Sequence, residues 1–142
     1  MIVKYTVTHP NLTPKQAVDG DKGYELRSAI EKVLDPGHTM LVPTGLSLEI
    51  PSHTFGMIWS KTSLALDYDI VVSNSPSIID SGYLGEIKVL LKNTGHTKYT
   101  VSRYSTVAQL LILTYSNIEL APVLQLGDTN MGIKGFGSAE LN

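Results

Sequence analysis

The chain has 142 residues, a formal net charge of −2 and 42% hydrophobic residues, which suits a single globular domain rather than a disordered or membrane-spanning chain. It contains no cysteine, which excludes disulfides, thiolate nucleophiles and cysteine metal sites. The low net charge provides no basic patch for a polynucleotide, so we expect no nucleic-acid partner. No apolar run has the length of a membrane span, so we expect no membrane partner. The lack of cysteine and of a charged-then-apolar pattern at the N-terminus predicts an intracellular location.

The first part of the chain predicts short strands separated by turns. Apolar and polar residues alternate along several of these segments, as in strands with one buried face. The residues Pro43, Thr44 and Gly45 predict a turn between two of the strands. The predicted strands cover residues 2–7, 24–29, 39–42, 46–50 and 55–59.

One short helix is predicted over residues 64–68, with Thr62 or Ser63 as its N-cap and Lys61 just before it. Free backbone N–H groups, two hydroxyls and an ammonium together suit a phosphate. An ordinary capped helical turn with a solvated lysine explains the same residues equally well. Both interpretations stay open on these residues alone.

The central stretch, residues 76–89, is flanked by apolar, strand-like runs at 70–72 and 87–91. It carries the carboxylate of Asp80, the aromatic ring of Tyr83 and two glycines. One interpretation is a reactive or binding turn held between strands. The alternative is an ordinary surface hairpin, because aspartate and glycine are what turns need in any case.

The second half of the chain adds strands at 98–101 and 107–113. Gln109 is the one amide in the more apolar of these strands and needs a hydrogen-bond partner, either in the core or on a bound water or phosphate. The glycine-rich segment 131–138 is either a frayed terminus or a flap that closes over a ligand. Strands every eight to twelve residues, with no long helical period, predict an all-β sandwich or jelly roll.

Five separated stretches resemble, in order and approximate spacing, the five motifs of the trimeric dUTPases, the dUTP nucleotidohydrolases. They are residues 21–29, 61–65, 78–87, 107–110 and 135–138. The resemblance spans nearly the whole chain, and the third stretch is the most specific. It implies a jelly-roll-like β barrel over residues 1–130 with one short helix, a flexible C-terminal flap over residues 131–142, and assembly as a homotrimer.

The activity implied by the resemblance is Mg²⁺-dependent hydrolysis of dUTP to dUMP and pyrophosphate, by attack of water on the α-phosphorus. Each site would take the hairpin from one subunit, the phosphate-binding motifs from a second and the flap from a third. Asp80 would activate the water, with Gln109 as a further catalytic contact, and Glu25 would reach the metal through its water shell. Tyr83 would pack under the deoxyribose and exclude a 2′-hydroxyl.

The same resemblance assigns substrate contacts to residues in three of the motifs and to single residues just before the third and the fifth. Backbone groups from about Asn74 to Tyr83 would read the uracil edge, and Phe136 would stack on the base when the flap closes. The implied substrate-binding residues are Lys61, Thr62, Ser63, Asn74, Ile79, Tyr83, Lys134, Phe136, Gly137 and Ser138.

Several positions depart from the family pattern. Lys61 and Met131 stand where arginines are usual, and Glu25 stands where an aspartate is usual. A glycine is replaced by Ser77, and the usual Gly-x-Arg of the fourth motif is replaced by residues 104–106, Tyr-Ser-Thr. These changes motivate an alternative function, a catalytically weakened or inactive interaction or regulatory protein that keeps the fold.

A third function, deamination of dCTP, belongs to a related enzyme with the same fold. Its pattern places a catalytic glutamate three residues before a strand-ending asparagine. Here Leu90 precedes Asn93, so deamination is disfavoured.

Overall fold

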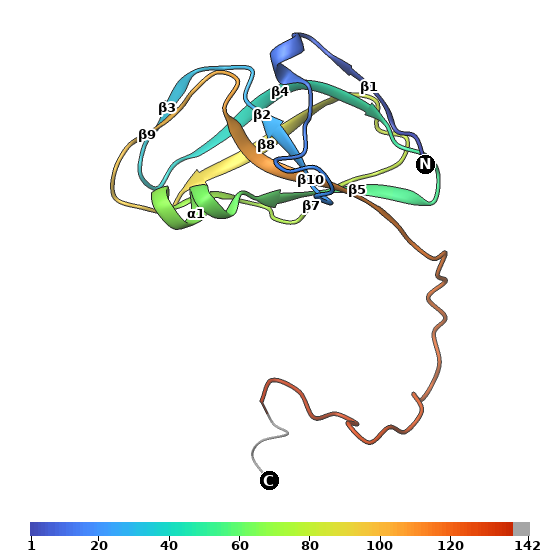
Figure 1. The fold of residues 1–142 in the computed structure, drawn as a ribbon. Coiled ribbons are helices and arrows are strands. Elements are labelled where there is room, and N and C mark those ends of the chain that lie inside the picture. The colour runs from blue at the N-terminus through green and yellow to red at the C-terminus, as the bar shows by residue number, and fades with distance from the viewer. Residues whose placement is uncertain (138–142) are drawn as a thin grey trace.

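The computed structural model describes residues 1–137, which form two four-stranded sheets and one two-stranded sheet (Figure 1). All pairings among the strands are antiparallel. This confirms the prediction of a mostly β fold with one short α-helix. The elements are β1 (Lys4–Val7), a 3₁₀ turn (Pro10–Leu12), β2 (Tyr24–Arg27), β3 (Lys32–Leu34), β4 (Thr39–Glu49), β5 (Thr54–Ser60), α1 (Thr62–Tyr68), β6 (Ile70–Val72), β7 (Ser77–Ile79), β8 (Glu86–Asn93), β9 (Tyr99–Val101) and β10 (Thr106–Thr114).

The hydrophobic core is built from side chains of both four-stranded sheets. The first sheet has the order β1-β4-β8-β6 and the second the order β2-β10-β5-β7. Alternation along β8 buries Ile87, Val89 and Leu91, and the same rule buries Ile58 on β5. Burial of these branched side chains supplies the main driving force for folding.

The two apolar runs that flank the central stretch do pair with each other, as β6 and β8, with Val72 opposite Leu91. The stretch between them is not a simple turn, because it contains β7. This strand pairs with β5 in the other sheet, where Ile78 lies opposite Met57. Residues 80–85 therefore cross from one sheet to the other.

The predicted turn at Pro43–Gly45 is wrong, because these residues lie inside the long strand β4. The pairing of β4 with β8 shifts register between Pro43 and Ser47, and this irregularity accommodates both the proline and the glycine. Gly45 has φ +64°, and a Cβ there would lie 2.7 Å from Leu12 Cδ1. A side chain at position 45 would therefore disturb the packing of the N-terminal segment.

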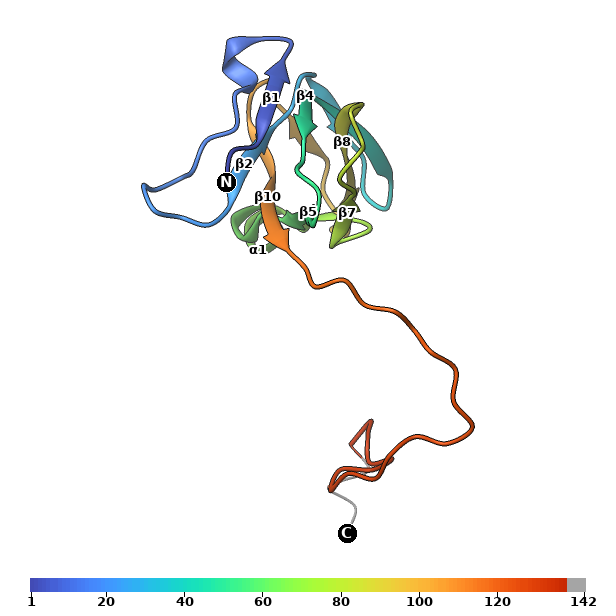
Figure 2. The ribbon, with the colours of Figure 1, turned by 90° about the vertical axis from the view of Figure 1, so that its right-hand side faces the viewer.

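The chain beyond β10 leaves the body of the molecule. Residues 115–137 contain no strand or helix and project away from both sheets (Figures 1 and 2). The described part of the chain has no helix of the length and apolarity that a membrane crossing requires. This tail nevertheless exposes many apolar side chains, including Ile118, Leu120, Leu124, Leu126, Ile133 and Phe136.

Candidate active site

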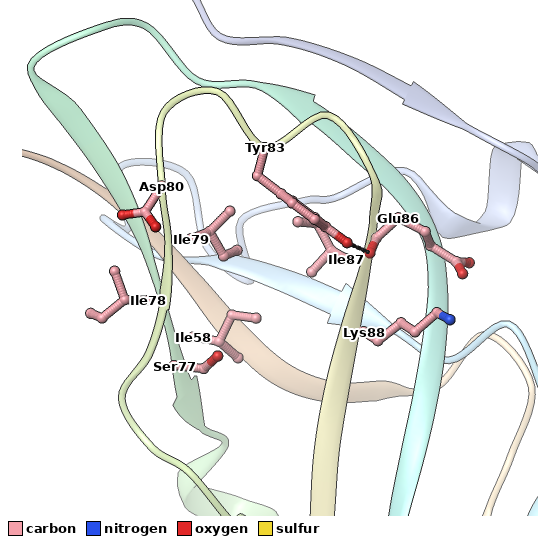
Figure 3. A pocket seen from close by; sticks show the side chains of 9 residues that line it. All are labelled: Ile58, Ser77, Ile78, Ile79, Asp80, Tyr83, Glu86, Ile87 and Lys88. Carbon is pink, nitrogen blue, oxygen red and sulfur yellow. Dashed lines mark hydrogen bonds between the residues drawn. The ribbon is translucent and has the colours of Figure 1, made fainter.

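A cleft of about 300 Å³ lies between β7 and β8, where the two sheets part (Figure 3). β7 is an edge strand, and β6 pairs only with residues 91–93 of β8. In both strands, the backbone edge beside the cleft therefore has no strand partner within residues 1–137. Its N–H donors and C=O acceptors are available to a ligand. The lining residues are Ile58, Ser77, Ile78, Ile79, Asp80, Tyr83, Glu86, Ile87 and Lys88.

Asp80 follows directly after β7 at the mouth of this cleft (Figure 3). Its main-chain carbonyl accepts a hydrogen bond of 3.2 Å from the N–H of Tyr83, which closes a tight turn. Gly82, with φ +125°, supplies the backbone conformation that this turn requires. Within residues 1–137 the exposed carboxylate of Asp80 has no hydrogen bond or ion pair, so both oxygens are free to accept a proton or a hydrogen bond.

Tyr83 lies across the opening between the two strands, and its hydroxyl donates to the main-chain oxygen of Glu86 at 2.9 Å (Figure 3). Gly85 makes this position possible, because a Cβ there would lie 2.7 Å from the Tyr83 hydroxyl oxygen. The side chain remains 47% exposed. A rigid ring held in this way can pack against the sugar of a bound nucleoside.

A second cluster of polar side chains lies around Glu25 on β2. Lys61, just before α1, places its Nζ 3.0 Å from Glu25 Oε1. Thr106 on β10 donates its hydroxyl to Glu25 Oε2 at 3.0 Å. Arg27 Nη2 lies 3.9 Å from the same oxygen. These four residues, Glu25, Arg27, Lys61 and Thr106, are called the Glu25 cluster below.

The ionised form of Glu25 is favoured by its surroundings. Burial opposes ionisation, but the hydrogen bonds from Lys61 and Thr106, together with the charges of Lys61 and Arg27, outweigh it and lower the pKa below the ordinary value. The carboxylate therefore acts as the anchor that holds the two cations in place.

This lowered pKa predicts a pH dependence of stability. Because the pKa of Glu25 is below its ordinary value of 4.5, the ionised group stabilises the fold above about pH 4.5, and the contribution is lost as the pH falls through the folded-state pKa. The difference in free energy of unfolding between the wild type and Glu25→Gln should be constant from neutral pH down to about 5 and shrink below 4.5. Urea unfolding at a series of pH values measures it, and a difference that grows toward acid would contradict the prediction.

Gln109 lies next to the Glu25 cluster, because it is the cross-strand partner of Glu25 on one side and of Trp59 on the other. A cavity of about 290 Å³ opens beside it. The lining residues of this cavity are Ala17, Asp21, Lys22, Gly23, Glu25 and Gln109. Gln109 is thus part of an accessible face and not a core amide.

The predicted helix is confirmed as α1, but the prediction that Thr62 or Ser63 is its N-cap is wrong. The helix begins at Thr62, and Lys61 takes the N-cap position without a side-chain hydrogen bond. The hydroxyls of Thr62 and Ser63 are therefore exposed and make no capping bond. Lys61 has an extended backbone, so the helical conformation begins only at the next residue. Its side chain is directed to Glu25 and not to the first turn of the helix.

Most of the remaining predicted residues lie apart from both the cleft and the Glu25 cluster. Asn74 is exposed in the turn between β6 and β7 and does not line the cleft, although Ile79 does. Lys134, Phe136 and Gly137 lie in the projecting tail, and Ser138 is outside the described residues. In the single chain, the cleft with Asp80 and the Glu25 cluster share no residue.

Two of the departures from the family pattern have a clear local structure. Ser77 pairs with Ile58 in β7 and is not among the residues of positive φ, so serine is accepted there without strain. Tyr104 has φ +68°, the region that favours glycine, and its ring stacks on His9 at a centroid distance of 4.9 Å. The backbone shape expected of a glycine is thus kept by a tyrosine whose ring gains a packing partner.

Arg27 and Thr106 are members of the Glu25 cluster that sequence reasoning did not assign. The two-residue spacing of Glu25 and Arg27 placed them on one face of a strand and was a usable signal. The role of Thr106 depends on the register of β10 against β2, which the sequence does not show.

The chain thus has an all-β fold with a strand-edge cleft, a free carboxylate at its mouth and a partly buried cluster of two cations around Glu25. Residues 10–140 match the family model described as dUTPase. The chain is 42% identical over 125 residues to the deoxyuridine 5′-triphosphate nucleotidohydrolase of Alkaliphilus metalliredigens, covering 88% of this chain and 87% of that protein. It is 38% identical over 130 residues to that of Gloeothece citriformis, covering 92% and 90%.

Solved structures agree at the level of the fold. The Staphylococcus bacteriophage 80alpha dUTPase with dUPNHPP superposes with a TM-score of 0.87 at 23% identity, over 96% of this chain and 97% of that one. The dUTPase of S. aureus phage phi11, described with a structural Mg(II) ion, has a TM-score of 0.80 at 20% identity, over 88% and 98%. The chain belongs to the dUTPase family.

Proposed function

We propose that the chain hydrolyses dUTP to dUMP and pyrophosphate, with water attacking the α-phosphorus and Asp80 as the general base. The observation that carries this role is the free Asp80 carboxylate at the mouth of a cleft lined by two strand edges. A positioned carboxylate accepts a proton from an attacking water as the new bond to phosphorus forms, and pyrophosphate leaves. Gln109 supports the reaction by hydrogen bonding to the water or a phosphate oxygen.

Selection of the base and sugar is assigned to the cleft. The free edge of β7, around Ile79, presents N–H and C=O groups in the alternation that the amide edge of uracil requires. Tyr83 then lies against the deoxyribose, where a 2′-hydroxyl would collide with the ring. A site of this kind rejects a larger base or an extra hydroxyl by steric conflict and unpaired polar groups.

Magnesium is the metal implied by the family, and its fit depends on Glu25. Residues 1–137 contain no group of three acidic or histidine side chains that could hold a metal ion alone. Both oxygens of Glu25 already accept bonds from Lys61 and Thr106, yet each retains capacity for one more donor. This arrangement suits an indirect contact through a water of the ion. When carried by the triphosphate, the metal would neutralise phosphate charge.

A homotrimer with shared sites is the assembly we propose. The separation of the Asp80 cleft from the Glu25 cluster within one chain supports it, as do the exposed apolar residues of the tail. Lys61, Thr62 and Ser63 of a second subunit would then bind the phosphates. The flap, residues 131–142, would come from a third subunit, with Phe136 on the base and Lys134, Gly137 and Ser138 near the phosphates.

The outer face of the second sheet is a candidate for the contact between subunits. Leu111, Met57 and Ile78 lie directly opposite one another on three adjacent strands. Trp59 and Leu113 extend the same face and are exposed. A continuous apolar face of this kind on a sheet requires a partner surface.

This face predicts a specific effect on assembly. The variant Leu111→Lys should sediment as a monomer of 15.4 kDa under conditions where the wild type sediments as three chains, because an ammonium would be buried in the interface. The matched control Leu41→Lys, at a 55% exposed position on β4, should remain trimeric. Trp59 is the one tryptophan of the chain, so its fluorescence should shift on dissociation. A trimeric Leu111→Lys protein would remove this face from the interface.

Pyrophosphate release tests the proposed activity. With Mg²⁺ present, the purified protein should release pyrophosphate from dUTP and hardly at all from dTTP, dCTP or UTP. Absence of release from dUTP at any practical enzyme concentration would refute the activity. It would favour instead a dUTPase-fold interaction or regulatory protein, for which Met131 and Thr106 at positions of usual cations are the motivating observation.

A further inference from the structure

The Glu25 cluster contains one more positive charge than Glu25 can neutralise. Two cations, Lys61 and Arg27, lie within 4.0 Å of one carboxylate. The side chains are largely shielded, with exposed fractions of 28% for Arg27, 15% for Glu25 and 25% for Lys61. A shielded group of net charge +1 favours an anion much more than a solvated lysine on an open surface does.

Arg27 occupies a distinctive place in this cluster because of strand register. It is the cross-strand partner of Thr106, with which it shares a face of the sheet. Thr106 stands where the dUTPase pattern has an arginine. The short side chain of Thr106 donates its hydroxyl to Glu25. Because Arg27 lies opposite Thr106 across the strands, its guanidinium lies close to the position that the usual arginine would occupy.

The hydrogen-bonding capacity of Arg27 is largely unused. A guanidinium has five N–H donors. Arg27 Nε is buried and has no hydrogen-bond partner among residues 1–137, and Nη2 is 3.9 Å from Glu25, which is an ion pair without a hydrogen bond. Lys61 and Thr106, by contrast, are both hydrogen bonded to Glu25 at 3.0 Å. Arg27 is therefore the cation of the cluster whose N–H donors have no acceptor among residues 1–137.

We propose that Arg27 binds a phosphate group of the substrate and supplies there the positive charge that the chain lacks at Thr106 and Met131. The inference rests on the proposed function for the identity of the substrate. Glu25 holds Lys61 and orients Arg27, and the phosphate oxygens accept the N–H groups that Glu25 leaves free. A planar guanidinium suits this role because it can bind two oxygens of one phosphate.

The test uses Arg27→Gln, Arg27→Lys and the matched control Lys98→Gln, which removes a cation from an ion pair with Asp35 at 3.6 Å. Calorimetric titration with inorganic pyrophosphate and with deoxyuridine separates the phosphate contact from the base contact. Arg27→Gln should weaken pyrophosphate binding and raise KM for dUTP by about tenfold to a hundredfold, as expected for a lost charge-assisted hydrogen bond, with deoxyuridine affinity unchanged. Lys98→Gln should change none of these values.

Arg27→Lys and one double variant keep the result decisive. Arg27→Lys should lose less affinity than Arg27→Gln, because it keeps the charge and loses the fork. Adding Thr106→Arg to Arg27→Gln should restore pyrophosphate binding. Unchanged pyrophosphate affinity in Arg27→Gln, or equal losses for pyrophosphate and deoxyuridine, would overturn the proposal. If the wild type failed to hydrolyse dUTP, the proposed function would fall, and the pyrophosphate titrations would still decide whether Arg27 binds phosphate.

Discussion

Asp80→Asn is expected to lower kcat for dUTP hydrolysis by about 10²- to 10⁴-fold, which is the usual contribution of a positioned general base. The amide keeps the size and the turn position of the carboxylate but cannot accept the proton of the attacking water. Because the Asp80 side chain makes no ion pair within residues 1–137, its replacement should leave the fold intact. Steady-state pyrophosphate release measures the effect.

Binding separates the role of Asp80 from simple damage to the site. Titration with the imido analogue dUPNHPP should give nearly the same Kd for Asp80→Asn as for the wild type, because the substitution removes a proton acceptor and no phosphate contact. Asp35→Asn, at a half-exposed carboxylate paired with Lys98, is the matched control and should hydrolyse dUTP at the wild-type rate. Full activity in Asp80→Asn would show that another group activates the water.

Truncation after Gly132 is expected to reduce kcat/KM for dUTP by roughly a hundredfold, the scale of loss that follows when reacting groups are no longer held in position. Of the removed residues, those that the structure describes, 133–137, lie away from both sheets in the single chain, so the two sheets should keep their stability (Figure 2). Sedimentation should still show the trimer, because Leu111 and its neighbours remain.

A pair of substitutions shows which residue of the flap matters. Phe136→Ala should account for most of the loss, since its ring is the one assigned to stack on the base. Ile133→Ala is the matched control, because both side chains are fully exposed in the single chain. Equal activity of the truncated and the full-length protein would remove Phe136, Gly137 and Ser138 from the site.

The sequence predicted residues 46–50 as strand from their alternation, and in β4 Leu46 and Leu48 are indeed buried while Ser47 and Glu49 are not. It predicted β10 from its continuous apolar run. It missed β3, whose three residues are too few to show a period. It also split β4 at Gly45, since proline and glycine usually mark turns. Only the pairing of β4 with β8 shows that the chain runs through this irregularity as one strand.

The sequence placed some of the candidate site residues near one another but did not reveal the Glu25 cluster. Asp80 and Tyr83 lie together in one cleft, as the local sequence allows. Glu25 and Thr106 are 81 positions apart and meet only through the register of β2 and β10. A shift of one residue would turn one side chain to the other face of the sheet, so no local pattern could have revealed this hydrogen bond.

The cleft is a seam between two sheets, and its floor is therefore also the hydrophobic core. Ile58, Ile79 and Ile87 line the cleft and are 1%, 7% and 2% exposed. In the proposed function, the width available to the pyrimidine would therefore be set by how tightly the two sheets pack, and not by a surface loop that can vary freely. Under that proposal, discrimination between uracil and a methylated base would depend on the same side chains that stabilise the domain, so selection for fidelity and selection for stability would act on one set of residues.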